Sequence, residues 1–187
     1  MSTVLDTLHE FHRPRIAVVG NSPRILERQD GAFIDGHDTV IRFNFALPDD
    51  SNAASIGRRT DVMIAAKSIT SRKNQNGTIK QMRAENPKVK LICRAGHRAA
   101  DFHFPPHLSR RLTRQWGAEP SSGLMVLYLL LGETKPKKVT AYGFDGLKTR
   151  PYYRCGPVHS ARHKPAIEQE KLADFDSSEL FEIIKYD

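Results

Sequence analysis

Two short runs of apolar, strand-forming residues each end in side chains that can hydrogen-bond a ligand. Residues 16–19 are followed by Gly-Asn-Ser at 20–22, and residues 39–43 are followed by Asn44. A glycine lets a backbone come close to a bound group, and amide and hydroxyl side chains supply donors and acceptors. The same residue types also form ordinary surface turns, so the first segment alone is consistent both with a turn and with a ligand-binding loop.

Two further segments carry groups suited to phosphate binding and to proton transfer. Pro-Ser-Ser-Gly at 120–123 precedes a Leu-rich run. A serine there can cap a helix N-terminus, whose backbone N–H groups favour a phosphate. His163 is followed five positions later by Glu168, and Pro165 between them suits the first turn of a helix. A histidine just before that helix lies near partial positive charge, which discourages the imidazolium.

Other chemistries are disfavoured by the residue pattern. A dinucleotide-binding loop needs Gly-x-Gly-x-x-Gly, whereas residues 20–23 are Gly-Asn-Ser-Pro, so a dehydrogenase is disfavoured. Asp35, His37 and Asp38 are of metal-ligating types, but residues this close in sequence do not converge easily on one ion. We therefore predict no metal site.

The segments that carry the candidate residues alternate between predicted strands and a predicted helix. We expect strands at 16–19, 39–43, 61–65, 89–93 and 138–144 and a helix over 122–131. This order predicts an α/β fold with a mostly parallel sheet, whose ligands bind beyond the carboxyl ends of the strands. The stretches 68–88 and 97–108 are expected to be long surface loops.

Composition indicates a single globular domain over residues 1–187, with 39% hydrophobic and 27% charged residues. Lys and Arg number 29 against 21 Asp and Glu, and the formal net charge of +8 favours an anionic partner: nucleic acid, an acidic membrane surface or a phosphate-bearing substrate. We expect no signal peptide or membrane helix, because no apolar stretch is long enough. Cys93 and Cys155 lack metal-ligand spacing, and reduced thiols in a cytoplasm are the simplest interpretation.

Three blocks of sequence resemble the motifs of one enzyme family, the family 29 glycosyltransferases, or animal-type sialyltransferases. VVGNSP at 18–23, IDGHDTVIRFN at 34–44 and IGRRTDV at 56–62 resemble the family's large sialyl motif. Residues 120–144 are similar to the small sialyl motif, and HKPAIE at 163–168 is similar to the very short motif. The resemblance extends over nearly the whole chain.

The resemblance implies a single Rossmann-like α/β domain of the GT-A type and an inverting transferase that uses a CMP-activated acidic sugar. It makes His163 the general base that takes a proton from the acceptor hydroxyl. Neither a metal nor another cofactor is expected. The residues implied in nucleotide and donor binding are Asn21, Ser22, Asn44, Ser121, Ser122 and Gly123, with Tyr142 and His159 as further candidates.

The chain departs from the family pattern at several positions. Ile16 and Pro136 stand where animal members have two cysteines joined as a disulfide, which favours a bacterial-type cytoplasmic member. Pro151 stands where the third motif usually begins with histidine. His159 is the candidate to replace that histidine, although His159 taken alone is more simply a solvated loop residue. For Tyr142, packing in the core is an equally good interpretation.

The expected partners are a CMP-sugar donor and a glycan acceptor such as lipopolysaccharide or a capsule, with the positive charge holding the protein near an anionic membrane. One alternative keeps the fold and uses CMP-Kdo or another 3-deoxy-ulosonate donor. A nucleotide-binding relative without catalysis is a second alternative, because the third motif is eroded. A basic nucleic-acid-binding module is a third, although the basic residues do not cluster and aromatic interleaving is lacking.

Overall fold

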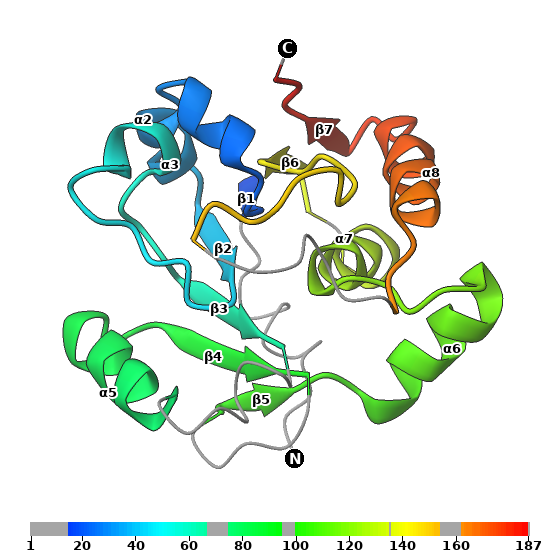
Figure 1. The fold of residues 1–187 in the computed structure, drawn as a ribbon, viewed down its shortest axis with the longest axis horizontal. Helices are drawn as coiled ribbons and strands as arrows, with labels where there is room; N and C mark the ends of the chain where they lie inside the picture. The colour runs from blue at the N-terminus through cyan, green and yellow to red at the C-terminus, as the bar shows by residue number, and fades with distance from the viewer. Residues whose placement is uncertain (1–14, 67–74, 95–99, 135, 154–161, 187) are drawn as a thin grey trace.

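The computed structural model describes residues 15–66, 75–94, 100–134, 136–153 and 162–186 (Figure 1). The strands are β1 (Arg15–Val19), β2 (Thr39–Phe43), β3 (Val62–Ala65), β4 (Lys90–Cys93), β5 (Phe102–His103), β6 (Lys138–Tyr142) and β7 (Phe181–Ile183). The helical elements are the 3-10 helix η1 (Pro23–Glu27) and the α-helices α2 (Gly31–Asp35), α3 (Ala53–Ile56), α5 (Gln75–Glu85), α6 (Pro106–Trp116), α7 (Ser122–Glu133) and α8 (Pro165–Asp176).

The described strands form one parallel sheet in the order β5-β4-β3-β2-β1-β6-β7, which confirms the predicted α/β class. The chain moves outward from β1 through β2, β3, β4 and β5 and then returns to the other side of β1 with β6 and β7. In such sheets a ligand binds beyond the carboxyl ends of the strands, where the direction of winding reverses. Here that point lies between β1 and β6.

Alternate side chains of the central strands build a core on each face of the sheet. Ile16 and Val18 of β1 belong to the cluster that includes residues of α6, α7 and α8, whereas Ala17 and Val19 pack with residues of η1, α2 and α3. In Figure 1 the helices α6, α7 and α8 lie to the right of the sheet, and α2, α3 and α5 lie to its left. The sheet is therefore covered on both faces, as its continuously apolar strands require.

Two stretches predicted as loops contain regular elements, so those predictions were wrong. Helix α5 lies within 68–88; it is polar and contributes Ile79 and Met82 to the core, an apolar stripe too narrow to stand out in the sequence. The stretch 97–108 holds β5, which is only two residues long, and the start of α6. Pro106 is the first residue of α6, a position where proline is tolerated. In this segment the proline therefore indicates the start of a helix and not a loop.

The ends of β1 and β6 approach each other so closely that the first loop must begin with glycine. The Gly20 N–H donates to the Tyr142 carbonyl oxygen at 2.7 Å, and the Ser22 N–H donates to the Gly143 carbonyl oxygen at 3.1 Å. A Cβ atom on residue 20 would lie 2.5 Å from the Gly143 carbonyl oxygen, which no side chain tolerates. The glycine is thus required by strand packing at the point where the winding reverses.

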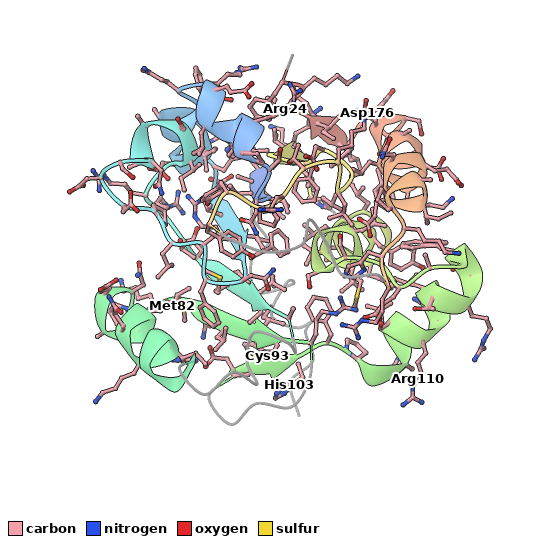
Figure 2. All side chains as sticks on the ribbon, viewed as in Figure 1. Arg24, Met82, Cys93, His103, Arg110 and Asp176 are labelled. Atoms are coloured by element: carbon pink, nitrogen blue, oxygen red, sulfur yellow. The ribbon has the colours of Figure 1, made fainter. Side chains whose placement is uncertain are left out.

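Cys93, at the end of β4, is buried in a cluster with Met82 of α5 (both labelled in Figure 2). Burial, with a smaller effect of Asp101, raises the pKa of the Cys93 thiol to about 11. Cys155 lies outside the described residues. None of the described helices has the length and apolar character needed to cross a membrane.

Candidate functional site

A cavity of about 320 Å³ lies at the carboxyl edge of the sheet, beside the ends of β1, β2 and β6. Residues that follow those strands line it, together with the starts of α7 and α8. Seven of the residues predicted from the sequence line this cavity: Asn21, Ser22, Asn44, Ser121, Ser122, Gly123 and His163. The aromatic side chains of Phe43, Phe104 and Phe144 form apolar parts of its lining. A cavity with an apolar lining and a few placed polar groups is the form that small-molecule sites usually take.

The two strand-end asparagines are held in place by the ends of the strands beside them. The Asn44 N–H donates to the Ile64 carbonyl oxygen at 2.7 Å, and its Oδ1 accepts from the Ala66 N–H at 3.0 Å. Its φ of 59° lies in the left-handed region, which asparagine adopts more readily than most residues. The Nδ2 of Asn21 donates to the Phe43 carbonyl oxygen at 3.5 Å. These contacts use the side-chain amide oxygen of Asn44 and the side-chain amide nitrogen of Asn21.

The start of α7 has two backbone N–H groups for which its cap supplies no acceptor. Ser121 caps the helix: its Oγ accepts from the Leu124 N–H at 3.1 Å, and its carbonyl oxygen accepts from the Met125 N–H at 3.1 Å. The N–H groups of Ser122 and Gly123 precede these in the first turn, and both residues line the cavity. Unpaired N–H groups at a helix start are suited to an anion.

Glu168 ties α8 to the start of α7. Its Oε1 accepts from the Ser121 N–H at 2.6 Å, and its Oε2 accepts from the Ser121 hydroxyl at 2.8 Å. The residue is buried, and burial raises the pKa of its carboxyl group, although the bonds from Ser121 and the charges of His163 and Arg94 oppose that shift. Because the Ser121 hydroxyl donates its hydrogen bond to Glu168, this serine organises the helix start and has no further O–H to donate to a ligand.

His163 immediately precedes Lys164, the residue before α8, and a backbone carbonyl orients its ring. The Nδ1 atom lies 2.7 Å from the Glu119 carbonyl oxygen. Because a carbonyl oxygen only accepts, Nδ1 must carry a proton, and in the neutral ring Nε2 then holds the lone pair. The residue is half-buried and lines the cavity. Its placement suits a proton acceptor.

An ion-pair cluster that sequence reasoning missed lies beside this histidine. The Arg94 guanidinium, just after β4, donates to Glu119 Oε1 at 3.1 Å, and Arg162 lies 3.4 Å from Glu119 Oε2. Burial lowers the pKa of Arg94, and Glu119 opposes that shift. Neither Arg94 nor Glu119 belongs to a motif recognised in the sequence. No local pattern links two residues that lie this far apart along the chain.

The remaining predicted residues are Tyr142 and His159, and Ser22 also has partners within the protein. Tyr142 packs in the core on the face of η1, α2 and α3 and does not line the cavity; burial raises its pKa to about 12. The structure therefore places Tyr142 in the core instead of at the nucleotide position suggested for it. His159 lies outside the described residues. The Ser22 Oγ accepts from the Arg24 N–H at 3.4 Å and lies 3.2 Å from the Thr149 hydroxyl.

The residues of metal-ligating type near position 36 have separate structural partners. Asp35 accepts from the N–H groups of Arg58 and Arg59, at 2.8 and 2.9 Å. The His37 ring nitrogens lie within hydrogen-bond distance of the Phe33 carbonyl oxygen and the Thr140 hydroxyl, while Asp38 accepts from the Arg15 N–H. Across the part of the chain that the structure describes, no group of three or more His, Cys, Asp or Glu side chains is arranged to hold a metal ion.

Several solved structures share this fold. A mammalian sialyltransferase in complex with Gal-beta-1-3GalNAc-ortho-nitrophenol is 18% identical, with a TM-score of 0.63 over 98% of this chain and 80% of that chain. The alpha-2,3-sialyltransferase from Campylobacter jejuni is 14% identical, with a TM-score of 0.60 over 93% and 75% of the two chains. The sialyltransferase CST-II in complex with trisaccharide acceptor and CMP is 12% identical, with a TM-score of 0.53 over 92% and 80%. At these identities the likeness establishes the fold.

The sequence itself supplies the assignment to a family. No curated protein matches it. The model of glycosyltransferase family 29 (sialyltransferase) matches residues 5–102, which is more than half of the 187 residues and includes Asn21, Ser22 and Asn44. The chain is therefore a glycosyltransferase that belongs to family 29, the sialyltransferase family.

Proposed function

We propose that this protein transfers an acidic sugar from a CMP-activated donor to a hydroxyl group of a glycan, with inversion at the anomeric carbon. The observation that carries the proposal is that the uncapped N–H groups of α7 and the ring of His163 lie at one cavity. The N–H groups suit a leaving phosphate, and the histidine suits an attacking hydroxyl. A glycosyl transfer reaction needs both.

The nucleotide of the donor is assigned to the wall formed by the two asparagines. The hydrogen bonds among the described residues use neither the amide N–H groups of Asn44 nor the amide oxygen of Asn21, so these groups are assigned to the ligand. Cytosine offers the complementary set, because its ring carries two acceptors and an amino donor. The CMP complex of CST-II, which has the same fold, supports this assignment.

The chemical step begins when His163 Nε2 takes the proton of the acceptor hydroxyl. The hydroxyl oxygen forms a bond to the anomeric carbon from one face, while the bond from that carbon to the phosphate oxygen breaks on the other face. CMP leaves with the electron pair of that bond, so the configuration at the anomeric carbon inverts. Proton removal of this kind contributes about 10²–10⁴-fold to the rate.

The charge on the departing CMP is assigned to protein groups. The N–H groups of Ser122 and Gly123 and the N-terminal dipole of α7 face an anion favourably, and Arg162 lines the same cavity. We therefore propose that transfer needs no divalent metal. Full activity after exhaustive treatment with EDTA is expected, and a loss that Mg²⁺ or Mn²⁺ restores would contradict this part of the proposal.

The acceptor is assigned to the glycans of lipopolysaccharide or a capsule, reached in the cytoplasm at the surface of an anionic membrane. The formal net charge of +8 supports the membrane contact, because it attracts anionic surfaces. Structures of the same fold hold Gal-beta-1-3GalNAc-ortho-nitrophenol or a trisaccharide acceptor. Sedimentation with vesicles of phosphatidylglycerol, compared with neutral phosphatidylcholine vesicles, tests the membrane part; equal binding to both would contradict it.

Calorimetric titration with CMP, UMP and GMP tests the nucleotide assignment, and we expect CMP to bind most tightly. Release of CMP from CMP-sialic acid and from CMP-Kdo then distinguishes the two donor classes. Nucleotide binding without turnover of either donor would identify a non-catalytic relative. Failure of all three nucleotides to bind would overturn the proposal.

A further inference from the structure

We infer that Arg94 is a positioning residue for His163 and that it acts through the backbone of residues 119–121. The inference rests on the proposed role of His163 as the base. Arg94 belongs to none of the motifs recognised in the sequence, and its contact with the reaction is indirect. Its contribution is to fix the carbonyl group that determines which nitrogen of His163 carries a proton.

One guanidinium holds three acceptors around the segment that contacts the histidine. Arg94 Nη2 donates to Glu119 Oε1 at 3.1 Å and to the Ser109 Oγ of α6 at 3.2 Å, and Nη1 donates to the Pro120 carbonyl oxygen at 3.2 Å. The Arg94 side chain is only 11% exposed, so water screens these contacts weakly. The segment is thereby fixed both through a side chain and through its backbone.

The same segment carries the acceptor of the histidine proton. The Glu119 carbonyl oxygen lies 2.7 Å from His163 Nδ1. Arg94 donates hydrogen bonds to both residues that this peptide group joins, to the side chain of Glu119 and to the carbonyl oxygen of Pro120. Loss of these contacts would leave residues 119–121 with the two hydrogen bonds from Ser121 to Glu168, which lie one residue beyond the peptide group, and Glu119 with the Arg162 ion pair at 3.4 Å, whose arginine side chain is 66% exposed. An exposed pair of this kind contributes little to order.

Lysine cannot replace arginine in this role. A guanidinium offers five N–H donors in a planar fork, whereas an ammonium is a point charge on a flexible stem. The three acceptors of Arg94 lie on three different residues, so one ammonium group at position 94 cannot reproduce the contacts. An Arg94→Lys variant therefore keeps the charge and loses the geometry.

The test measures the tautomer of His163 directly, by the ¹⁵N chemical shifts of the imidazole nitrogens in the 187-residue chain. The signals of His163 are assigned by their loss in His163→Gln. In the wild type we expect a single tautomer with the proton on Nδ1. In Arg94→Met and Arg94→Lys we expect both neutral tautomers to be populated, with kcat lowered about tenfold or more and CMP affinity within about twofold of the wild type.

Arg83→Met is the matched control, because Arg83 forms a 2.9 Å ion pair with Asp101 and is likewise partly buried. We expect it to leave the His163 tautomer unchanged. A wild-type ring protonated on Nε2, or a single Nδ1–H tautomer in the folded Arg94 variants, would overturn the inference. If Arg94→Met fails to fold, Arg94→Lys decides by the same criterion. The spectra need no substrate, so a wild type without transferase activity would refute the proposed function while still reporting on Arg94.

Discussion

The carbonyl oxygen of Glu119 determines how the ring of His163 presents its two nitrogens. A side-chain hydroxyl in that place can donate or accept, and would allow either tautomer. A backbone carbonyl accepts only, so the 2.7 Å contact assigns the proton to Nδ1 and leaves the lone pair of the neutral ring on Nε2. The chemistry proposed for this residue thus depends on a main-chain group that no sequence motif records.

Replacement of His163 by alanine tests its role as the base. We expect kcat to fall by about 10²–10⁴-fold while CMP affinity is retained, because the ring is assigned to the acceptor proton and not to the nucleotide. His107→Ala is the control, since His107 is exposed on α6 and does not line the cavity. We expect His159→Ala to weaken donor use more mildly. Near-full turnover in His163→Ala would contradict the assignment and make His159 the first alternative.

Replacement of Asn21 and Asn44 by alanine tests the nucleotide wall. Loss of a buried hydrogen bond to the base costs about 1–3 kcal/mol, so each variant should bind CMP more weakly by that amount in calorimetric titration. Thermal unfolding of the variants separates this effect from the loss of the Asn44 contact with Ala66. Asn86→Ala is the control, because Asn86 does not line the cavity. Unchanged CMP affinity in the double variant would refute the nucleotide assignment.

Residues inside motifs could be predicted from the sequence, and residues that support them could not. Local patterns indicate Asn44 and Ser121: the first directly follows a strand, and the second caps a helix. Arg94 and Glu119 meet only because β4 and the segment before α7 end at the same edge of the sheet. The tertiary structure brings these two residues together, so neither spacing nor periodicity in the sequence predicts their contact.

At the scale of elements, Glu168 joins α8, which the proposed base His163 precedes, to α7, whose start forms the proposed phosphate site. It lies in the first turn of α8, and both of its carboxylate oxygens accept from Ser121, the cap of α7. The five-residue spacing from His163 to Glu168 therefore has a structural reason. It places the histidine before α8 while the carboxylate docks that helix against α7.

Replacement of Glu168 by alanine is expected to lower the free energy of unfolding by about 1–3 kcal/mol, because the Ser121 N–H and hydroxyl lose their acceptors in a buried place. Urea unfolding followed by circular dichroism measures it. Glu170→Ala, on the exposed side of the same helix, removes only a surface pair with Lys171 and should change stability by less than about 0.5 kcal/mol. Equal effects of the two variants would contradict the docking role.

The pH dependence of stability gives a second test of Glu168. Burial raises the pKa of its carboxyl group in the folded protein, so the folded state holds this proton to a higher pH than the unfolded chain does. The corresponding stability is present below the unfolded pKa, about 4.3, and is lost as pH rises through the folded pKa. The wild type should therefore lose stability relative to Glu168→Gln as pH rises through that window. Parallel curves for the two proteins would refute the shift.

At the scale of the whole molecule, the pattern of buried strands carries most of the information about the fold. The predicted runs at 16–19, 39–43 and 61–65 coincide within one residue with β1, β2 and β3, because a strand buried on both faces must be apolar at consecutive positions. Helix α5 was not predicted, because its sequence is mostly polar and shows no clear apolar pattern. It covers an edge of the sheet with few apolar side chains, and packing stabilises it more than its own sequence does.

The two cysteines test the chain as a whole, because their redox state reflects the compartment in which it works. Cys93 is buried, and burial raises the pKa of its thiol to about 11, so little thiolate forms at pH 8. Iodoacetamide should therefore leave Cys93 unmodified in the native protein and modify it in urea, as measured by mass spectrometry of proteolytic peptides. The Cys93→Ala, Cys155→Ser double variant should keep the fold, with some loss of stability from the cavity at position 93. A native disulfide between the two cysteines, found under non-reducing conditions, would contradict both the burial of a free thiol and the cytoplasmic location proposed for this enzyme.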